Sequence, residues 1–167
     1  MDAVVVRAAN GGDLLPLTEM YNHYVKTSPA TFDLEPVTAE SRREWMSHYA
    51  GAGRHRLLVA MVGGAFAGYA TSGKVKERPG YLTSVETSVY VHPDRNGHGV
   101  GTRLYTELFA ALGKEDLHRA YAAIVPPNPA SVALHVKFGF APVGLYTEIG
   151  RKFGRYWDVQ WFERPLP

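Results

Sequence analysis

The sequence predicts a mixed α/β fold, in which a central sheet of about six to seven strands is flanked by about four helices. Two features predict it. Segments of strand and helix character follow one another in the order β-α-α-β-β-β-α-β-α-β-β. Some strands are joined by tight glycine turns and others by helices, so antiparallel and parallel pairs share one mixed sheet. A chain of 167 residues has the size of one domain, which we expect to span residues 1–167.

Runs rich in β-branched and aromatic residues predict the strands. They lie at residues 4–8, 56–62, 65–72, 81–91, 119–125, 140–148 and 156–164. The second and third are antiparallel, because Gly63-Gly64 between them is a two-residue turn that accepts positive φ. In the fourth, Glu86, Ser88 and Tyr90 alternate with β-branched residues and so face the other side of the sheet. Residues 150–154 are the expected turn between the last two strands.

Four segments with apolar residues at helical spacing predict the helices. They lie at residues 14–27, 38–50, 100–113 and 128–138. Asp13, Thr38 and Asn128 are suitable N-caps for three of them. The third helix has one apolar face, with residues at four-residue steps at Val100, Leu104, Leu108 and Leu112.

The composition excludes several classes of function. The formal net charge is +2 and the 18 basic residues are scattered, so nucleic acid is not an expected partner. The absence of cysteine excludes disulfides, iron–sulfur clusters and thiol catalysis. The seven histidines lack the spacing of a metal site, and we expect no metal. No apolar run has the length of a membrane helix and residues 1–7 lack a secretory pattern, so we expect a cytoplasmic protein without a membrane partner.

The strongest local signal is the glycine-rich segment 96–102 between a predicted strand and a predicted helix. Gly97, Gly99 and Gly101 let the backbone turn tightly and aim several N–H groups at one point, beside the positive end of the helix. A pyrophosphate suits that environment. A strand-to-helix turn with glycines present only for steric reasons is the alternative. The segment lacks the Lys of a Walker loop, and Thr102 stands at the third glycine of a Rossmann turn.

Further motifs follow one another across nearly the whole chain. They are Tyr21-Asn22-His23-Tyr24, Thr27-Ser28 with Phe32, Val85-Glu86-Thr87-Ser88-Val89-Tyr90-Val91, Asn128-x-x-Ser131-x-x-Leu134-His135, Phe138-Gly139-Phe140, Phe153-Gly154-Arg155 and Trp157-Asp158-Val159. Together with Val91-x-Pro93 and the three glycines, they resemble GNAT superfamily N-acetyltransferases and, within these, the phosphinothricin acetyltransferase family. Asn96 departs from the pattern, because the GNAT loop usually has Arg or Gln there.

The resemblance implies that acetyl-CoA is the co-substrate. The residues that it places on the pyrophosphate are Asn96, Gly97, His98, Gly99, Val100, Gly101 and Thr102. It also implies that Asn128, with Ser131, contacts the pantetheine arm, although helix capping alone would explain both residues. Backbone groups of Val89 and Val91 are expected to bind that arm where the strand splays from its neighbour. The Val89 or Tyr90 amide is the candidate oxyanion hole.

Two side chains are candidates for the chemistry. Glu86 lies within a β-branched and aromatic strand, where partial burial would raise its pKa toward that of a general base. The resembling enzymes have their catalytic glutamate there. The alternatives are a solvated strand face or an ion pair with a basic residue of segment 74–78. His135 lies beside an apolar stripe, where a lone histidine is more often a satisfied core residue. The resemblance implies that it protonates the thiolate or assists Glu86.

Six residues are candidates for the acceptor site, the last two within the turn Lys152-Phe153-Gly154-Arg155: Phe32, Lys76, Arg78, Tyr81, Phe153 and Arg155. Lys76 and Arg78 offer cations for a carboxylate or phosphinate, with a solvated loop as the alternative. Val75 stands where related enzymes commonly have tryptophan, and the smaller valine side chain should enlarge or reshape the pocket.

We therefore expect direct acetyl transfer to the α-amino group of a small amino acid or analogue, such as phosphinothricin or methionine sulfoximine or sulfone. One alternative is a non-catalytic acyl-CoA-binding or regulatory domain. Another is an acetyltransferase of protein N-termini or polyamines, whose acceptors need an open and often acidic groove. Similar enzymes are usually dimers, which implies a homodimer.

Overall fold

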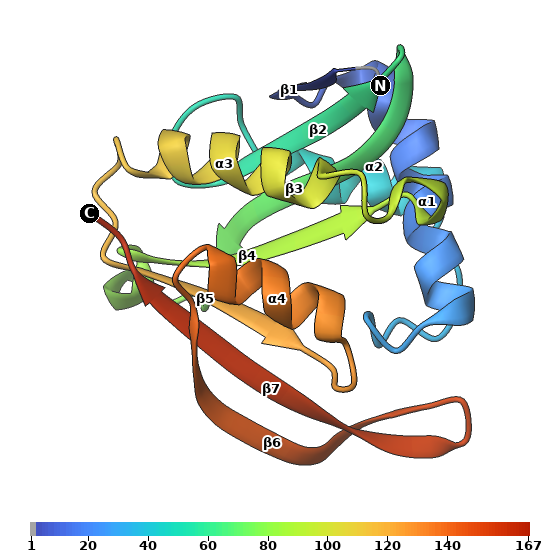
Figure 1. Cartoon of the computed structure of the whole chain (residues 1–167), viewed down its shortest axis with the longest axis vertical. Helices are drawn as coiled ribbons and strands as arrows, with labels where there is room; N and C mark the ends of the chain where they lie inside the picture. The colour runs from blue at the N-terminus through green and yellow to red at the C-terminus, as the bar shows by residue number, and fades with distance from the viewer. Residues whose placement is uncertain (1–2) are drawn as a thin grey trace.

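The computed structural model describes residues 3–167, in which seven strands form one sheet with helices on both faces (Figure 1). The strands are β1 (Val4–Ala8), β2 (Arg56–Val62), β3 (Ala65–Lys74), β4 (Ser84–Val91), β5 (Arg119–Ile124), β6 (Ala141–Lys152) and β7 (Arg155–Pro165). The helices are α1 (Leu14–Thr27), α2 (Ala39–Ser47), α3 (Val100–Leu112) and α4 (Pro129–Lys137). The predicted order of strands and helices is confirmed. Met1 and Asp2, which open the segment considered for a secretory signal, lie outside the described residues.

The sheet is mixed, as predicted. Its strands lie in the order β1-β2-β3-β4-β5-β7-β6, and every neighbouring pair is antiparallel except β4 and β5. The Gly63-Gly64 turn joins β2 to β3, with φ angles of 57° and 80°. No helix within residues 3–167 is long and apolar enough to cross a membrane.

Several predicted boundaries are wrong by a few residues. β4 begins at Ser84, because Pro79–Tyr81 form a short 3₁₀ turn that ends the preceding loop. β3 extends to Lys74, α2 ends at Ser47, and β5 ends at Ile124. These ends lie next to loops, where periodicity carries the least information.

The predicted turn at residues 150–154 is also wrong. β6 continues through Gly150 to Lys152, and only Phe153-Gly154 remains as the loop. Both loop residues have positive φ, 53° and 72°, which matches the right-handed twist of a tight hairpin. β6 and β7 therefore form a long ribbon that projects beyond the helices (Figure 1).

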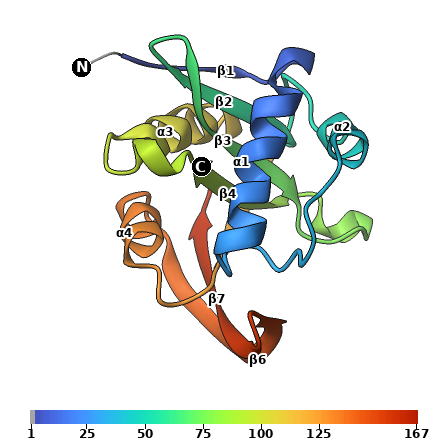
Figure 2. The same ribbon diagram turned by 90° about the vertical axis from the view of Figure 1, so that its right-hand side faces the viewer.

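Each face of the sheet buries its own core. On one face α3 packs against the strands through fully buried Leu104, Tyr105 and Leu108, and α4 packs beside it. On the other face Leu17 and Met20 of α1 contact Tyr69 of β3 and side chains of α2. Figure 2 shows α1 and α2 on the side of the sheet opposite to α3 and α4.

The alternation predicted for β4 is confirmed and assigns its residues to these two faces. Val85 and Thr87 are buried on the α3 side. Glu86 and Ser88 are half-buried and face the side of α1 and α2. Neighbouring residues of β4 therefore serve different faces of the sheet.

β4 and β5 pair over only part of their length. The register joins Ser84 to Arg119, Val85 to Ala120 and Glu86 to Tyr121, and it ends there. From Thr87 onward the strand edge that faces β5 has no partner strand in the described part of the chain. The predicted splay of β4 from its neighbour is thus present, and it begins directly after Glu86.

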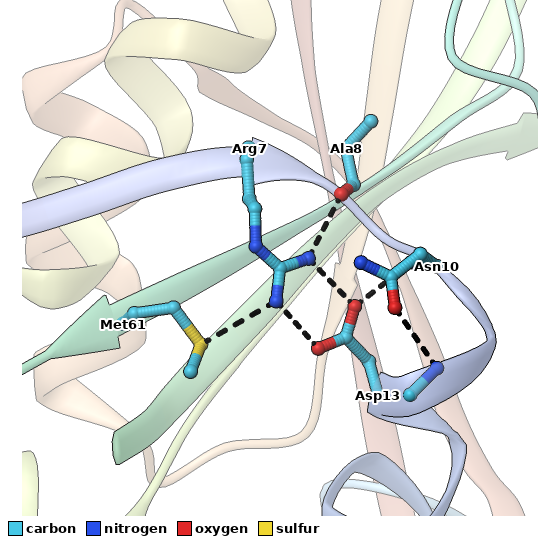
Figure 3. Close-up of polar contacts among 6 residues, drawn as sticks. Arg7, Ala8, Asn10, Asp13 and Met61 are labelled. Carbon is cyan, nitrogen blue, oxygen red and sulfur yellow. Dashed lines mark hydrogen bonds and ion pairs between the residues drawn. The ribbon is translucent and has the colours of Figure 1, made fainter. Parts of the chain in front are cut away.

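A charged contact joins the start of α1 to the edge of the sheet (Figure 3). The Asp13 carboxylate, 4% exposed, accepts hydrogen bonds from two nitrogens of Arg7 at 2.7 and 2.8 Å. It also accepts from the backbone N–H of Asn10 at 2.8 Å, while the Asn10 side chain accepts from Gly12. This reciprocal cap fixes the direction in which the chain enters α1.

Candidate active site

A groove of about 510 Å³ lies where β4 and β5 separate, between the N-terminal ends of α3 and α4. The predicted cofactor residues that line it are Val89, Tyr90, Val91, Asn96, Gly97, Gly99, Val100, Gly101, Thr102, Asn128 and Ser131. They come from three separate segments of the chain. The structure therefore brings eleven of the twelve predicted cofactor residues to one cavity.

The glycine-rich segment has the geometry of an anion site. Gly97 and Gly99 have φ of 78° and 77°, in the left-handed region, and α3 begins at the next residue. Within the described chain, no acceptor is bonded to the backbone N–H groups of Gly97, Gly99, Val100, Gly101 and Thr102. Unpaired N–H groups at the positive end of a 13-residue helix suit a phosphate.

His98 is the predicted cofactor residue that the structure places outside the groove. It lies between the two left-handed glycines, is exposed, and donates its N–H to Arg95 O at 3.4 Å. Gly101 faces inward, where a Cβ atom would lie 3.1 Å from Cδ2 of Leu134. The glycine at 101 is thus explained by the close approach of α3 to α4.

The free edge of β4 presents backbone groups to the groove. His92 donates its N–H to Ala67 of β3, and successive N–H groups of a strand point to alternate edges. The Val89 and Val91 groups therefore face the groove, whereas the Tyr90 N–H faces β3. Tyr24 of α1 donates its hydroxyl to Val91 O. Of the two candidate oxyanion donors, Val89 has the suitable direction and Tyr90 does not.

Asn128 and Ser131 form the N-terminal cap of α4, which is the simpler of the two roles expected for them. The Asn128 side-chain oxygen accepts from the Ser131 N–H at 3.2 Å. Both residues also line the groove, and the Asn128 side-chain nitrogen is not used in the cap. Capping and a cofactor contact are therefore compatible at Asn128.

Glu86 does not line the groove, but it lies at the end of the β4–β5 pairing, two residues before Ser88, which does. Its side chain is half-buried, and burial raises the pKa of its carboxyl above the ordinary value. The alternative of an ion pair with segment 74–78 is not observed: Lys74 pairs with Glu77 at 3.0 Å instead. A desolvated carboxylate without a cation partner has the properties of a general base.

His135 lines the groove from the other face of the sheet. It is 3% exposed, and burial lowers its pKa. One ring nitrogen, Nδ1, lies 2.7 Å from Ser131 O and therefore carries the proton; the other, Nε2, lies 2.9 Å from the Tyr105 hydroxyl, which donates to it. His135 is a satisfied, neutral histidine in this structure, and it is separated from Glu86 by the thickness of β4.

The predicted acceptor residues do not gather in one cavity. Lys76, Arg78 and Tyr81 are exposed on the loop before β4, and Phe153 and Arg155 are exposed at the tip of the β6–β7 ribbon. Phe32 is different, because its ring lies directly against Gly150 of β6 and leaves no room for a Cβ atom there. The loop after α1 and the ribbon are therefore in direct contact.

Comparison with known proteins agrees with the geometry of the groove. The model of the acetyltransferase (GNAT) family matches residues 17–140. The chain belongs to the acetyltransferase (GNAT) family. It is an N-acetyltransferase, and acetyl-CoA is its co-substrate.

Two relatives and one solved structure illustrate the similarity of this GNAT chain. It is 55% identical to the phosphinothricin N-acetyltransferase of Streptomyces coelicolor, over 98% of this chain and 96% of that protein. It is 33% identical to the L-methionine sulfoximine/L-methionine sulfone acetyltransferase of Pseudomonas paraeruginosa, over 96% and 94% of the two chains. The crystal structure of a phosphinothricin acetyltransferase from Sinorhizobium meliloti in complex with AcCoA matches with a TM-score of 0.92 and 32% identity, over 98% and 88%.

Sequence reasoning about this GNAT chain missed the buried Tyr105 of α3, which bonds His135. Tyr105 had no local signal, because it forms part of an apolar stripe. Lys152, expected in the turn of the acceptor site, is instead buried at the end of β6, where it donates to Ser28 O at 2.8 Å and Thr31 O at 2.7 Å. Within residues 3–167, no group of three His, Asp or Glu residues is placed to hold a metal ion.

Proposed function

We propose that this GNAT enzyme transfers the acetyl group of acetyl-CoA directly to the α-amino group of a small amino acid or analogue. Phosphinothricin and methionine sulfoximine or sulfone are the proposed acceptors, supported by the activities for which two relatives are named. The observation that carries the reaction is the half-buried Glu86 carboxylate beside a groove whose glycine-loop N–H groups are unpaired. No metal and no acyl-enzyme are needed.

In the proposed reaction the loop N–H groups of residues 97–102 hold the pyrophosphate, and the free edge of β4 holds the pantetheine arm. Glu86 takes a proton from the acceptor ammonium. The amine then attacks the thioester carbon, and the Val89 N–H stabilises the oxyanion. The C–S bond breaks, the thiolate takes a proton to leave as coenzyme A, and the nitrogen gives up its second proton to form the neutral amide.

We propose His135 as the source of that last proton, because it lines the groove. Its Nδ1 proton is held by Ser131 O at 2.7 Å, so Nδ1 must leave this bond to reach the sulfur. Because the ring is neutral, Nε2 takes a proton from the Tyr105 hydroxyl in the same step, and that hydroxyl takes the second proton of the attacking nitrogen. Assistance to Glu86 does not fit its position on the opposite face of β4. Tyr105, bonded to Nε2, would keep the ring in the donating tautomer.

The acceptor is proposed to enter from the Glu86 face, between the loop that contains Lys76, Arg78 and Tyr81 and the ribbon that contains Phe153 and Arg155. Lys76 and Arg78 are exposed and free to pair with a carboxylate or phosphinate. Phe32 would form part of the wall, held by the ribbon.

A thioester-consumption assay with a panel of amino acids tests the proposal. We expect turnover with phosphinothricin or a methionine sulfoximine or sulfone, and a loss of about 100- to 10,000-fold in kcat/KM for Glu86→Gln. Binding of acetyl-CoA to that variant should be unchanged. Glu107→Gln, which alters a surface pair with Arg103 on α3, is the matched control. Tight acetyl-CoA binding without turnover of any amine would favour a non-catalytic acyl-CoA-binding domain. Turnover of polyamines or peptide N-termini alone would favour an acetyltransferase of those acceptors.

We also propose that the chain is a single domain of residues 1–167, is cytoplasmic and forms a homodimer. The edge strand β6 supports the dimer, because its apolar residues are about half exposed: Val143 52%, Leu145 49%, Tyr146 51% and Ile149 57%. A long, apolar and unpaired edge strand is a liability unless something covers it. Sedimentation as a monomer at micromolar concentration would refute the dimer.

A further inference from the structure

The proposed reaction leaves one polar side chain beside Glu86 without a role. Tyr49 follows α2 and is half-buried against Trp45, with ring centroids 4.8 Å apart. Its hydroxyl points at the sheet and lies 3.5 Å from the place where a Cβ atom of Gly73 would be. A tyrosine with this contact lies over β3 on the same face as Glu86.

The register of β3 and β4 places this hydroxyl next to the base. Gly73 is the direct cross-strand partner of Glu86, and directly opposite residues of an antiparallel pair have Cβ atoms about 5 Å apart on the same face. Because Gly73 has no side chain, the Tyr49 hydroxyl occupies the space that a cross-strand neighbour of Glu86 would fill. A side chain at position 73 larger than a methyl group would separate the two groups.

The next cross-strand pair extends the polar row to the groove. Thr71 lies opposite Ser88, and their hydroxyl oxygens are 2.7 Å apart. Ser88 lines the groove, whereas Glu86 does not. Tyr49, Thr71 and Ser88 thus place three hydroxyls on the face of the sheet that contains Glu86, and Ser88 reaches the groove.

Burial is what raises the pKa of the Glu86 carboxyl, and the charge of Glu86 acts on Tyr49. Burial raises the pKa of Tyr49, hydrogen bonding with Thr71 and the charge of Arg42 lower it, and the charge of Glu86 raises it again. The phenol therefore remains protonated near neutral pH and is a hydrogen-bond donor. A donor beside a desolvated carboxylate stabilises its ionised form.

We propose that Tyr49 is a positioning residue for Glu86: its hydroxyl, seated over Gly73, donates to the carboxylate and joins it through Thr71 and Ser88 to the groove. This inference rests on the proposed role of Glu86 as the base. The ammonium proton then has a row of hydroxyls from the groove to the carboxylate, in which each oxygen takes one proton and gives up its own.

Other ionisable groups face Glu86 and would contribute to its titration. Arg42 lies on the α2 side, stacked on Trp45 with its guanidinium carbon 3.5 Å from the ring centroid. Lys74 of β3 lies opposite Val85, on the other face of the sheet from Glu86, and pairs with Glu77. On the other side, Tyr121 of β5 lies opposite Glu86, and Glu163 of β7 lies opposite Tyr121. The test must therefore change the Tyr49 hydroxyl and leave these groups in place.

The test compares the pH dependence of kcat/KM for wild type, Tyr49→Phe and Gly73→Ala. Loss of the donor raises the pKa of the Glu86 carboxyl, so the acidic limb should move up by about one pH unit in Tyr49→Phe, a loss of about tenfold on the acidic side. Gly73→Ala keeps the Tyr49 hydroxyl and adds a methyl group beside it. The methyl carbon would lie 3.5 Å from that hydroxyl and 4.0 Å from the Glu86 backbone oxygen, so it causes no clash. We expect a smaller shift in the same direction, because the methyl group partly screens the hydroxyl from the carboxylate, with acetyl-CoA affinity unchanged in both variants.

Tyr69→Phe is the matched control. It removes another buried hydroxyl from the same aromatic cluster, one that accepts from Arg42 at 2.9 Å. This change should lower Tm and leave the acidic limb in place. An acidic limb of Tyr49→Phe that coincides with wild type would overturn the inference, provided that Glu86→Gln is inactive. If Glu86→Gln is as active as wild type, the proposed base is wrong, whatever Tyr49→Phe does.

Discussion

Asp13→Asn tests how firmly α1 is attached to the sheet. The Asp13 carboxylate accepts three hydrogen bonds, two from Arg7 and one from the Asn10 N–H, and is 4% exposed (Figure 3). Asparagine keeps the shape but loses the charge, and its amide nitrogen meets a donor. The Arg7 side chain is 38% exposed, so water offsets part of the loss. We expect a cost of about 2 kcal/mol in the free energy of unfolding.

For a protein of this length, about 2 kcal/mol corresponds to a fall in Tm of about 4 to 8 °C. The sign of the pH dependence follows from the Asp13 pKa, which is lowered mainly by the hydrogen bond from Arg7. A lowered folded-state pKa adds stability above the unfolded value of about 4, and this stability is lost as the pH falls through the folded value. The difference in Tm should therefore be constant from pH 5 to 8 and shrink below about pH 4.

Thermal unfolding of wild type, Asp13→Asn and Asp116→Asn at several pH values checks this prediction. Asp116 pairs with Arg54 at 3.1 Å, but its side chain is 84% exposed, so its loss should cost less than about 0.5 kcal/mol. Equal Tm values for wild type and Asp13→Asn at pH 7 would refute the reasoning. So would a difference that persists undiminished at pH 3.

Three further predictions concern the groove. Gly68→Ala places a Cβ atom 2.6 Å from Tyr90 O, so it should cost about 1 to 3 kcal/mol in thermal unfolding and weaken acetyl-CoA binding in calorimetry. Gly99→Ala forces φ of 77° on alanine, at a cost of about 1 to 2 kcal/mol, and should raise the Kd for acetyl-CoA. The lowered pKa of His135 makes wild-type stability fall as the pH drops below about 6.5. The free energy of unfolding of His135→Gln, measured by urea unfolding at several pH values, should therefore depend less steeply on pH, and an equal pH dependence would contradict the burial effect.

The sequence predicted the parts of the fold that depend on local patterns. The alternation along β4 placed Glu86 and Thr87 on opposite faces, and the Gly63-Gly64 turn set the pairing of β2 with β3. The β6–β7 turn was predicted at the right place but too long, because Gly150 is typical of a turn, whereas β6 continues through it to Lys152. The remaining loop residue Phe153 adopts positive φ, a conformation that sequence rules assign to glycine or asparagine.

The site was predictable to the same extent. The glycine loop and the free edge of β4 are adjacent in sequence to recognisable elements, so their meeting in one groove follows from a strand–turn–helix pattern. Contacts between distant segments have no such signal. Lys152 is buried and donates hydrogen bonds to two carbonyls of the loop after α1. Arg42 is buried among aromatic rings, although lysine and arginine are usually exposed.

The length of the β4–β5 pairing links the two halves of the reaction. If the pairing continued beyond Glu86, β5 would use the Val89 N–H, and neither an oxyanion donor nor a groove would remain. Because it stops there, the strand edge is free from Thr87 onward, while Glu86 stays fixed between β3 and β5 on the opposite face from His135. The proposed base, Glu86, and the proposed acid, His135, thus lie on different faces of one strand, which would keep proton removal from the amine apart from proton return to the thiolate. We therefore expect a substitution that prolonged the pairing to disable both proposed steps without changing either side chain.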